Sequence, residues 1–138
     1  MADTIRFELV SPERLLMSED VAQVDVPGAE GDFGVLPMHA PAISTLRAGV
    51  MMVRGADGKT REVFVRGGFA EVRPDLLTVL AEQAIPVEEI DEAVLAQEIQ
   101  NAEEDVSDAT DDLIREKAEH RLARMKEVVA ALKAAGHG

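Results

Sequence analysis

The stretch LLTVLAEQAIPVEEIDEAVL, residues 76–95, contains the point at which the sequence changes from strand-forming to helix-forming. Before Pro86 the apolar residues run together or alternate with polar ones, which is typical of β-strands. After Pro86 most residues are Ala, Glu, Asp, Lys, Arg or Leu, which favour helices. Beyond Glu88 the chain has no proline, and its only glycines lie among the last three residues. The sequence therefore predicts a β domain over residues 1–86 and a helical part over residues 87–138.

Residues 1–86 show the alternation expected of strands that have one buried face. Apolar and charged residues alternate in Ile5–Leu9, in Gln23–Val26 and in Ala70–Arg73. Turn signals separate such runs, namely Pro27-Gly28, Asp57-Gly58, Gly67-Gly68 and Pro74-Asp75. We therefore expect a separate strand on each side of every signal, in a sandwich or barrel.

The helical part carries two apolar seams with heptad-like spacing. They consist of Leu95, Ile99, Ala102, Val106 and Ala109, and of Ala118, Leu122, Met125, Val129 and Leu132. The two seams are out of phase, so one continuous helix would not bury both, whereas two helices folded back on each other would. The polar residues 107–112 mark the expected bend, with Thr110 or an adjacent Asp as the cap of the second helix. This predicts helices over about 89–107 and about 111–134.

Charge is divided unevenly between these two helices. Residues 87–112 contain eleven acidic residues and no Lys or Arg, whereas residues 113–138 contain six Lys or Arg and three acidic residues. Antiparallel packing would place opposite charges side by side, and the alternative is that these are simply solvated helix faces. The whole chain has a formal net charge of −13. That charge disfavours nucleic acid and anionic lipid as partners and favours a basic protein.

The sequence offers little that would support catalysis. The absence of cysteine excludes a zinc–thiolate site and a cysteine nucleophile. His39, His120 and His137 lack the spacing of metal ligands, so we predict no metal site and no cofactor. No apolar run approaches the length of a membrane span, so we expect no direct membrane insertion. No secretory signal is visible at the N-terminus. We expect a non-catalytic protein.

Several segments, read in order, resemble one known family. Residues 31–41, GDFGVLPMHAP, resemble the pattern G-[ED]-x-G-[IV]-x-P-G-H-A-P, and residues 67–72, GGFAEV, resemble G-G-x-x-E-V. Val10–Glu13 resembles the opening turn of the same family, and Leu77–Ala81 resembles its following strand. The likeness covers nearly the whole chain in order. On these motifs the chain is similar to the epsilon subunits of F-type rotary ATP synthases, which are called delta in mitochondria.

The resemblance implies a β + α fold, with an N-terminal ten-stranded β-sandwich followed by a C-terminal antiparallel two-helix hairpin. It also implies a rotor subunit of the central stalk, which couples proton-driven rotation of the c-subunit ring through the gamma subunit to ATP synthesis. The implied location is the cytoplasmic face of the bacterial inner membrane. The implied partners are gamma, the c ring and, through the hairpin, the alpha and beta subunits.

The resemblance also assigns roles to individual residues. By family position, Glu30-Gly31-Asp32 would face the c ring. The segment Pro37-Met38-His39-Ala40-Pro41 would lie near gamma, and the alternative is a plain rigid loop. The hairpin cations Arg115, Arg121, Arg124 and Lys126 would reach an acidic loop of beta and regulate ATP hydrolysis. Their alternative role is to pair with the first helix.

The chain departs from the family at three positions. Where the family's ATP-sensing pattern reads [IL]-D-x-x-R-A, this chain has Val94 at the arginine position and Leu95 at the alanine position. A phosphate partner is therefore missing from the first helix. Asp91, Arg121 and Arg124 remain as candidate nucleotide-binding residues. Met38 stands where the family has glycine, which predicts a stiffer and more apolar loop. The competing hypotheses are a free-standing regulatory inhibitor of an ATPase and a nucleotide-sensing sandwich domain.

Overall fold

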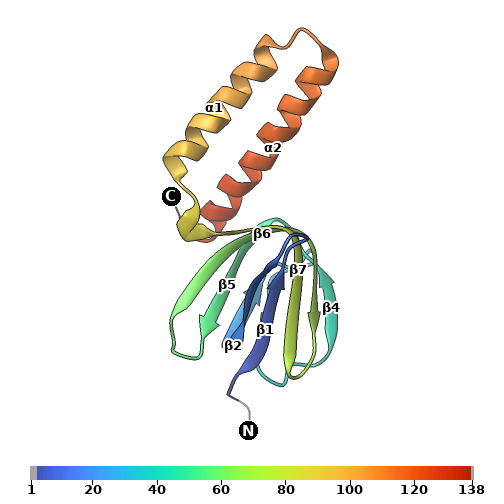
Figure 1. The fold of residues 1–138 in the computed structure, drawn as a ribbon, viewed down its shortest axis with the longest axis vertical. Helices are drawn as coiled ribbons and strands as arrows, with labels where there is room; N and C mark the ends of the chain where they lie inside the picture. Colours follow the sequence, from blue (N-terminus) through green and yellow to red (C-terminus); the bar gives the residue numbers. More distant parts are fainter. Residues whose placement is uncertain (1–2, 138) are drawn as a thin grey trace.

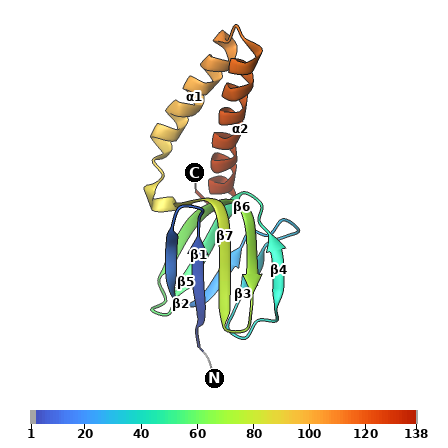
Figure 2. The same ribbon diagram turned by 45° about the vertical axis from the view of Figure 1, so that its right-hand side comes forward.

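Seven strands and a helical hairpin make up residues 3–137, the part of the chain that the computed structural model describes (Figure 1). The strands are β1 (Ile5–Val10), β2 (Leu15–Val26), β3 (Phe33–Val35), β4 (Ala42–Thr45), β5 (Gly49–Gly55), β6 (Thr60–Val72) and β7 (Leu76–Pro86). A 3-10 turn, Val87–Glu89, leads into α1 (Glu92–Asp108) and α2 (Asp112–Ala134). The helices project from the end of the sandwich opposite the start of β1 (Figures 1 and 2). Within residues 3–137, neither helix is long and apolar enough to cross a membrane.

The strands form a sheet that closes on itself. Their order is β1-β7-β6-β5-β2-β3, and β1 also pairs with β2, so the first five of these strands make a ring. The shorter strand β4 pairs with β6 outside this ring. The pairing of β1 with β7 is parallel, and the other pairings are antiparallel. Closure leaves few backbone groups of the ring free to pair with other chains.

Three strands are long enough to take part in both layers of the sandwich, and this corrects the predicted number of strands. β2, β6 and β7 contain 12, 13 and 11 residues. β6 pairs with β5 before a bend and with β4 after it. The bend lies at Gly67 and Gly68, with φ of 69° and 94°, a conformation that glycine adopts readily. We expected this pair to separate two strands, but the pairing with β7 runs through it, from Arg66 opposite Gln83 to Gly68 opposite Ala81. The described chain therefore has seven strands rather than ten, while the fold class, a β-sandwich followed by two helices, is confirmed.

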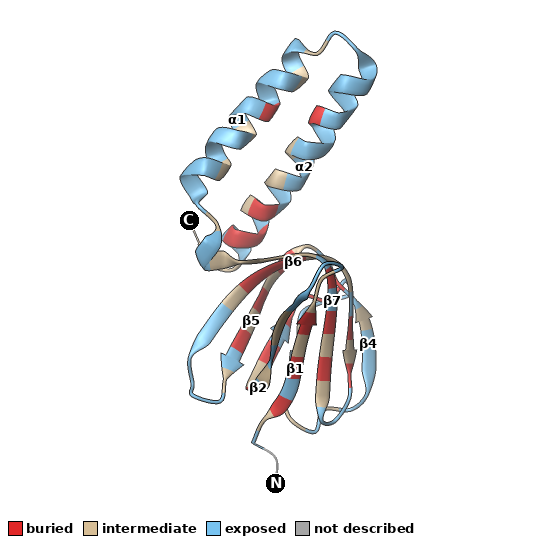
Figure 3. Cartoon of the chain, in the orientation of Figure 1, coloured by how far each residue is buried: buried red, intermediate tan, exposed pale blue. Residues whose placement is uncertain are grey.

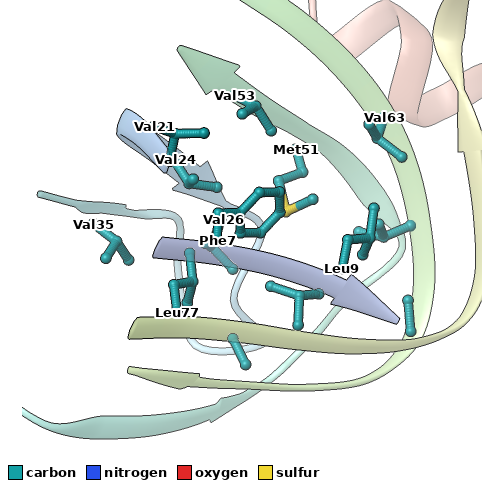
Figure 4. Packing of buried hydrophobic residues seen from close by; sticks show 14 of the residues in the cluster. Phe7, Leu9, Val21, Val24, Val26, Val35, Met51, Val53, Val63 and Leu77 are labelled. Atoms are coloured by element: carbon teal, nitrogen blue, oxygen red, sulfur yellow. The ribbon is translucent and has the colours of Figure 1, made fainter. Parts of the chain in front are cut away.

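The core of the sandwich follows the predicted alternation (Figure 3). In β1, Ile5, Phe7 and Leu9 are buried, whereas Arg6 and Glu8 stay in contact with solvent. Figure 4 shows the interior packing of Phe7, Leu9, Val21, Val24, Val26, Val35, Met51, Val53, Val63 and Leu77. No polar or charged residue is buried in the part of the chain that the structure describes. Apolar burial therefore supplies the main stabilisation of the sandwich.

The two helices pack along the predicted seams. Ala102, Ala118 and Leu132 are buried, and the other seam residues are partly buried. Arg121 of α2 makes an ion pair with Asp105 of α1, so the expected charge pairing between the helices occurs at this point. Most other acidic side chains of α1 face solvent, as the alternative interpretation proposed.

Only the base of the hairpin rests on the sandwich. Val128, Ala131 and Leu132 of α2 pack against Phe64 of β6 in a second, smaller apolar cluster. The outer part of the hairpin extends away from the strands (Figure 2). The hairpin is therefore an arm that is attached at one end.

The side chain of Asp111 caps α2, because its Oδ1 accepts hydrogen bonds from the backbone N–H groups of Leu113 at 2.7 Å and Ile114 at 3.4 Å. Loss of such a cap costs about 1 kcal/mol, and we expect Asp111→Ala to lower the free energy of unfolding of the hairpin by this amount. Asp112→Ala is the comparison, because it removes an equal charge from the same turn, together with an exposed ion pair to Arg115, and should cost less than Asp111→Ala. Urea unfolding followed by the helical circular dichroism signal measures both. Equal losses would show that charge, rather than capping, is responsible.

Candidate partner-binding surfaces

The loop Glu30-Gly31-Asp32 is exposed and held beside the end of β4. The backbone N–H of Ala29 donates to the carbonyl oxygen of Thr45 at 2.8 Å. Gly31 has a φ of 141°, which favours glycine at this turn. Asp32 makes an ion pair with Arg47, a contact between two loops that the sequence analysis did not identify. Glu30 remains as an exposed acidic group at the tip of the loop.

The segment Pro37–Pro41 lies before the other end of β4, and its backbone is fixed at two points. The N–H of Met38 donates to the carbonyl oxygen of Pro74 at 2.9 Å, and the N–H of His39 donates to that of Leu36 at 3.2 Å. Met38 has a φ of 67°, a conformation that glycine adopts far more easily than methionine. Its side chain is 68% exposed, so the strained position presents an apolar group to solvent.

The structure does not combine these two segments into one site. Residues 30–32 lie near Thr45, where β4 ends, whereas Pro41 immediately precedes the first residue of β4. The turn between β6 and β7 lies at the end of the sandwich away from the helices (Figure 2), and Met38 bonds to this turn through the carbonyl oxygen of Pro74. Two separate partner surfaces are therefore available.

An exposed apolar patch lies on the outer face of β4, β6 and β7. We call it the outer-face patch, and it consists of Ile43, Phe69 and Leu80, which are 73%, 38% and 37% exposed. Phe69 lies directly opposite Leu80 in the sheet. Ile43 lies opposite Glu71, which makes it a diagonal neighbour of Phe69 on the same face. Adjacent exposed apolar side chains of this size are typical of a protein interface.

The outer-face patch was not predicted from the sequence, although the alternation of β6 contains a signal for it. Ala70 and Val72 are buried, so Phe69 shares the outward phase with Glu71. A large aromatic side chain such as Phe69 is unusual on the solvent-facing side of a strand, and its presence there indicates the outer-face patch.

The four candidate cations of the hairpin are in different situations. Arg115 bonds to Asp112 at 3.4 Å and to the carbonyl oxygen of Ala109 at 2.9 Å, so it stabilises the connection between the helices. Arg121 pairs with α1, as described above. The side chains of Arg124 and Lys126 are exposed and form no ion pair within residues 3–137. These two are the cations that remain available to a partner.

The candidate nucleotide-binding residues do not converge. Asp91 caps α1 by accepting from the N–H groups of Ala93 at 3.0 Å and Val94 at 3.2 Å. Arg121 bonds to Asp105, which lies about 20 Å further along α1 than Asp91 at 1.5 Å per residue. No group of three or more His, Asp or Glu residues in the described part of the chain is arranged to hold a metal ion.

Comparison with known proteins identifies relatives of both parts of the chain. Residues 4–87 match the family model described as the ATP synthase delta/epsilon chain, beta-sandwich domain. The chain is 47% identical over 132 residues to an ATP synthase epsilon chain of Mesorhizobium japonicum, an alignment that covers 96% of this chain and 98% of that one. It is 46% identical over 138 residues to one of Rhodospirillum rubrum, with both chains fully covered.

Two solved structures are similar in fold. A chain in the mitochondrial ATP synthase of Euglena gracilis, in a structure containing OSCP, F1 and the c ring, matches with a TM-score of 0.75 and 28% identity. That match covers 96% of this chain and 83% of the Euglena chain. A chain from the central stalk and c ring of the Tetrahymena thermophila mitochondrial ATP synthase matches with a TM-score of 0.56 and 11% identity, covering 92% and 95%. This second likeness concerns the fold alone.

Proposed function

Because the chain belongs to the ATP synthase delta/epsilon chain family, we propose that it is a non-catalytic central-stalk subunit of an F-type ATP synthase. In this role it couples proton-driven rotation of the c ring through gamma to ATP synthesis. The observation that carries the proposal is the similarity over the full length, at 46% identity, to an ATP synthase epsilon chain. A match confined to the sandwich would leave the role of the hairpin open.

The sandwich, residues 1–86, is the docking unit in this proposal. The outer-face patch and the neighbouring segment Pro37–Pro41 bind gamma. The support is chemical, since Ile43 and Met38 expose large apolar side chains that a partner would remove from water. The loop Glu30-Gly31-Asp32 faces the c ring from its separate position. The assembled complex holds the chain at the cytoplasmic face of the bacterial inner membrane.

The hairpin, residues 87–138, is the regulatory unit. Arg124 and Lys126 are exposed and available for acidic groups of the alpha and beta subunits, whereas Arg115 and Arg121 are used within the hairpin. Such contacts would slow ATP hydrolysis by opposing rotation of the stalk. A free-standing inhibitor would use the same two cations but would not need the surfaces on the sandwich.

Affinity purification from native membranes tests the rotor role. We expect tagged full-length chain to recover the alpha, beta and gamma subunits, identified by mass spectrometry. Ile43→Asp should reduce this recovery at least tenfold, because a charge in the centre of an apolar interface would be desolvated. Glu8→Gln, on the same face of the sheet at β1, is the surface control and should leave recovery unchanged. Recovery of none of these subunits by the unaltered chain would contradict the proposal.

Calorimetry with ATP separates the rotor role from a nucleotide sensor. The phosphate partner at position 94 is missing, and the remaining candidates do not converge, so we expect a dissociation constant weaker than about 1 mM. The Val94→Arg variant, which restores only the arginine of the family pattern at an exposed position, is the informative comparison. Sub-millimolar binding by the unaltered chain would favour the nucleotide-sensing alternative.

A further inference from the structure

Every nitrogen of the Arg66 guanidinium group on β6 makes a hydrogen bond, and two of the three bonds cross from the sandwich to the hairpin. Its Nε donates to Oε2 of Glu127 at 3.0 Å, and its Nη2 donates to the carbonyl oxygen of Arg124 at 2.6 Å. Its Nη1 donates to Oε1 of Gln83 on the neighbouring strand β7. The group also lies 5.3 Å from the ring centre of Phe64, at cation–π distance. The side chain is only 12% exposed, so this is an organised contact rather than a transient surface pair.

The residues that contact the Arg66 guanidinium come from both the sandwich and the hairpin. Gln83 and Phe64 belong to the sandwich and orient the guanidinium, while Glu127 and the carbonyl of Arg124 belong to α2. The planar fork of arginine suits two acceptors on adjacent turns of a helix, a geometry that the single ammonium of lysine does not reproduce. The position of α2 on the sheet is therefore specified by Arg66.

The apolar cluster at the base of the hairpin supplies burial, which is non-directional, whereas the hydrogen bonds of Arg66 require one orientation of α2 on the sheet. One other side-chain hydrogen bond joins the two parts within residues 3–137, from His137 Nε2 to Glu62 Oε1 at 2.9 Å. Glu62 precedes Arg66 by four residues in β6, so this one strand provides both polar anchors.

We propose that Arg66 is a latch, which holds the hairpin docked on the sandwich without any ligand. All of the bonding partners of the latch come from the chain itself, so the docked state is complete in the absence of nucleotide. Opening of the hairpin requires the bonds to Glu127 and Arg124 to break together. The latch concerns the conformation of the isolated chain and does not depend on the proposed role in ATP synthesis.

The distance between the tip of the hairpin and the sandwich reports the latch directly. The chain has no cysteine, so Lys59→Cys and Thr110→Cys introduce the only two thiols, both at exposed turns, for spin labels. In this labelled background with Arg66 intact, we expect one narrow distance distribution that does not change when ATP is added. Arg66→Met should raise the open fraction at least about tenfold, because it removes hydrogen bonds made by a charged group. Arg66→Lys keeps the charge without the fork and should fall between the two.

Arg73→Met is the matched control. Arg73 pairs with Glu71 of the same domain at 2.9 Å and, among the described residues, forms no ion pair with the hairpin, so this variant should keep a narrow distance distribution. Glu127→Gln weakens the latch from the helix side and should open the hairpin by a smaller factor. In the Arg66→Met background the same Glu127→Gln change should have no further effect, as expected for one shared interaction. A closed distribution in Arg66→Met, or in Glu127→Gln if Arg66→Met does not fold, would overturn the proposal. Closure of the unaltered chain only when ATP is present would overturn it as well.

Discussion

Replacing Gly68 with alanine should lower the free energy of unfolding by about 4 kcal/mol, most of the stability of a typical small domain. Two effects combine at this residue. Its φ of +94° is one that residues with a side chain rarely adopt, and an added Cβ would lie 1.7 Å from the carbonyl oxygen of Leu80. A backbone oxygen of a paired strand cannot move aside as the end of a flexible side chain can. The strands β6 and β7 would have to separate at the bend that joins the two layers.

Gly58→Ala provides the control for this effect. Gly58 has a φ of +85°, close to that of Gly68, but nothing lies within 4 Å of its added Cβ. Conformational strain alone should cost about 1 kcal/mol at this exposed turn. Urea denaturation of both variants measures the difference. Similar small losses would mean that β6 and β7 adjust easily, and that the bend at Gly68 does not depend on close approach of the strands.

Replacing Phe7 by alanine should mainly reduce stability, whereas replacing Phe69 by alanine should mainly reduce partner binding. Phe7 is completely buried in the core, and Phe7→Ala should lower the free energy of unfolding by about 3–5 kcal/mol. Phe69, in the outer-face patch, is 38% exposed, and its loss should cost less than about 1 kcal/mol of stability. If the patch binds gamma, however, Phe69→Ala should weaken that binding by about 2 kcal/mol, roughly 30-fold in Kd.

Urea unfolding and a titration with purified gamma subunit separate these two effects. Phe7→Ala should be measured for binding only at temperatures where it stays folded. Leu80→Ala repeats the test on the opposite strand of the patch and should weaken gamma binding without a large loss of stability. Unchanged gamma binding in both Phe69→Ala and Leu80→Ala would remove the outer-face patch from the interface.

The features that the sequence predicted well depend on local periodicity. The alternation in Ile5–Leu9 identifies the buried face of β1, because neighbouring residues of a strand point to opposite faces. The spacing that includes Ala102 and Ala118 likewise identifies the facing sides of the two helices. In each case the information lies within a few residues, where a sequence pattern can express it.

The features that the sequence did not predict depend on which distant segments become neighbours. Arg66 and Glu127 are separated by 61 positions along the chain, so nothing near either residue indicates their contact. The pairing of Asp32 with Arg47 has the same character. Gly67 and Gly68 read as an interruption because a glycine pair usually ends a strand, whereas here the pairing of β7 continues past both.

The continuity of β6 has a consequence for how the molecule opens. Since one strand contributes hydrogen bonds to both layers, neither layer can detach while the other remains folded, and the sandwich is a single cooperative unit. The outer part of the hairpin has no such link and can exchange its amide hydrogens through local opening. We therefore expect the outer part of the hairpin to open or unfold locally without destabilising the sandwich.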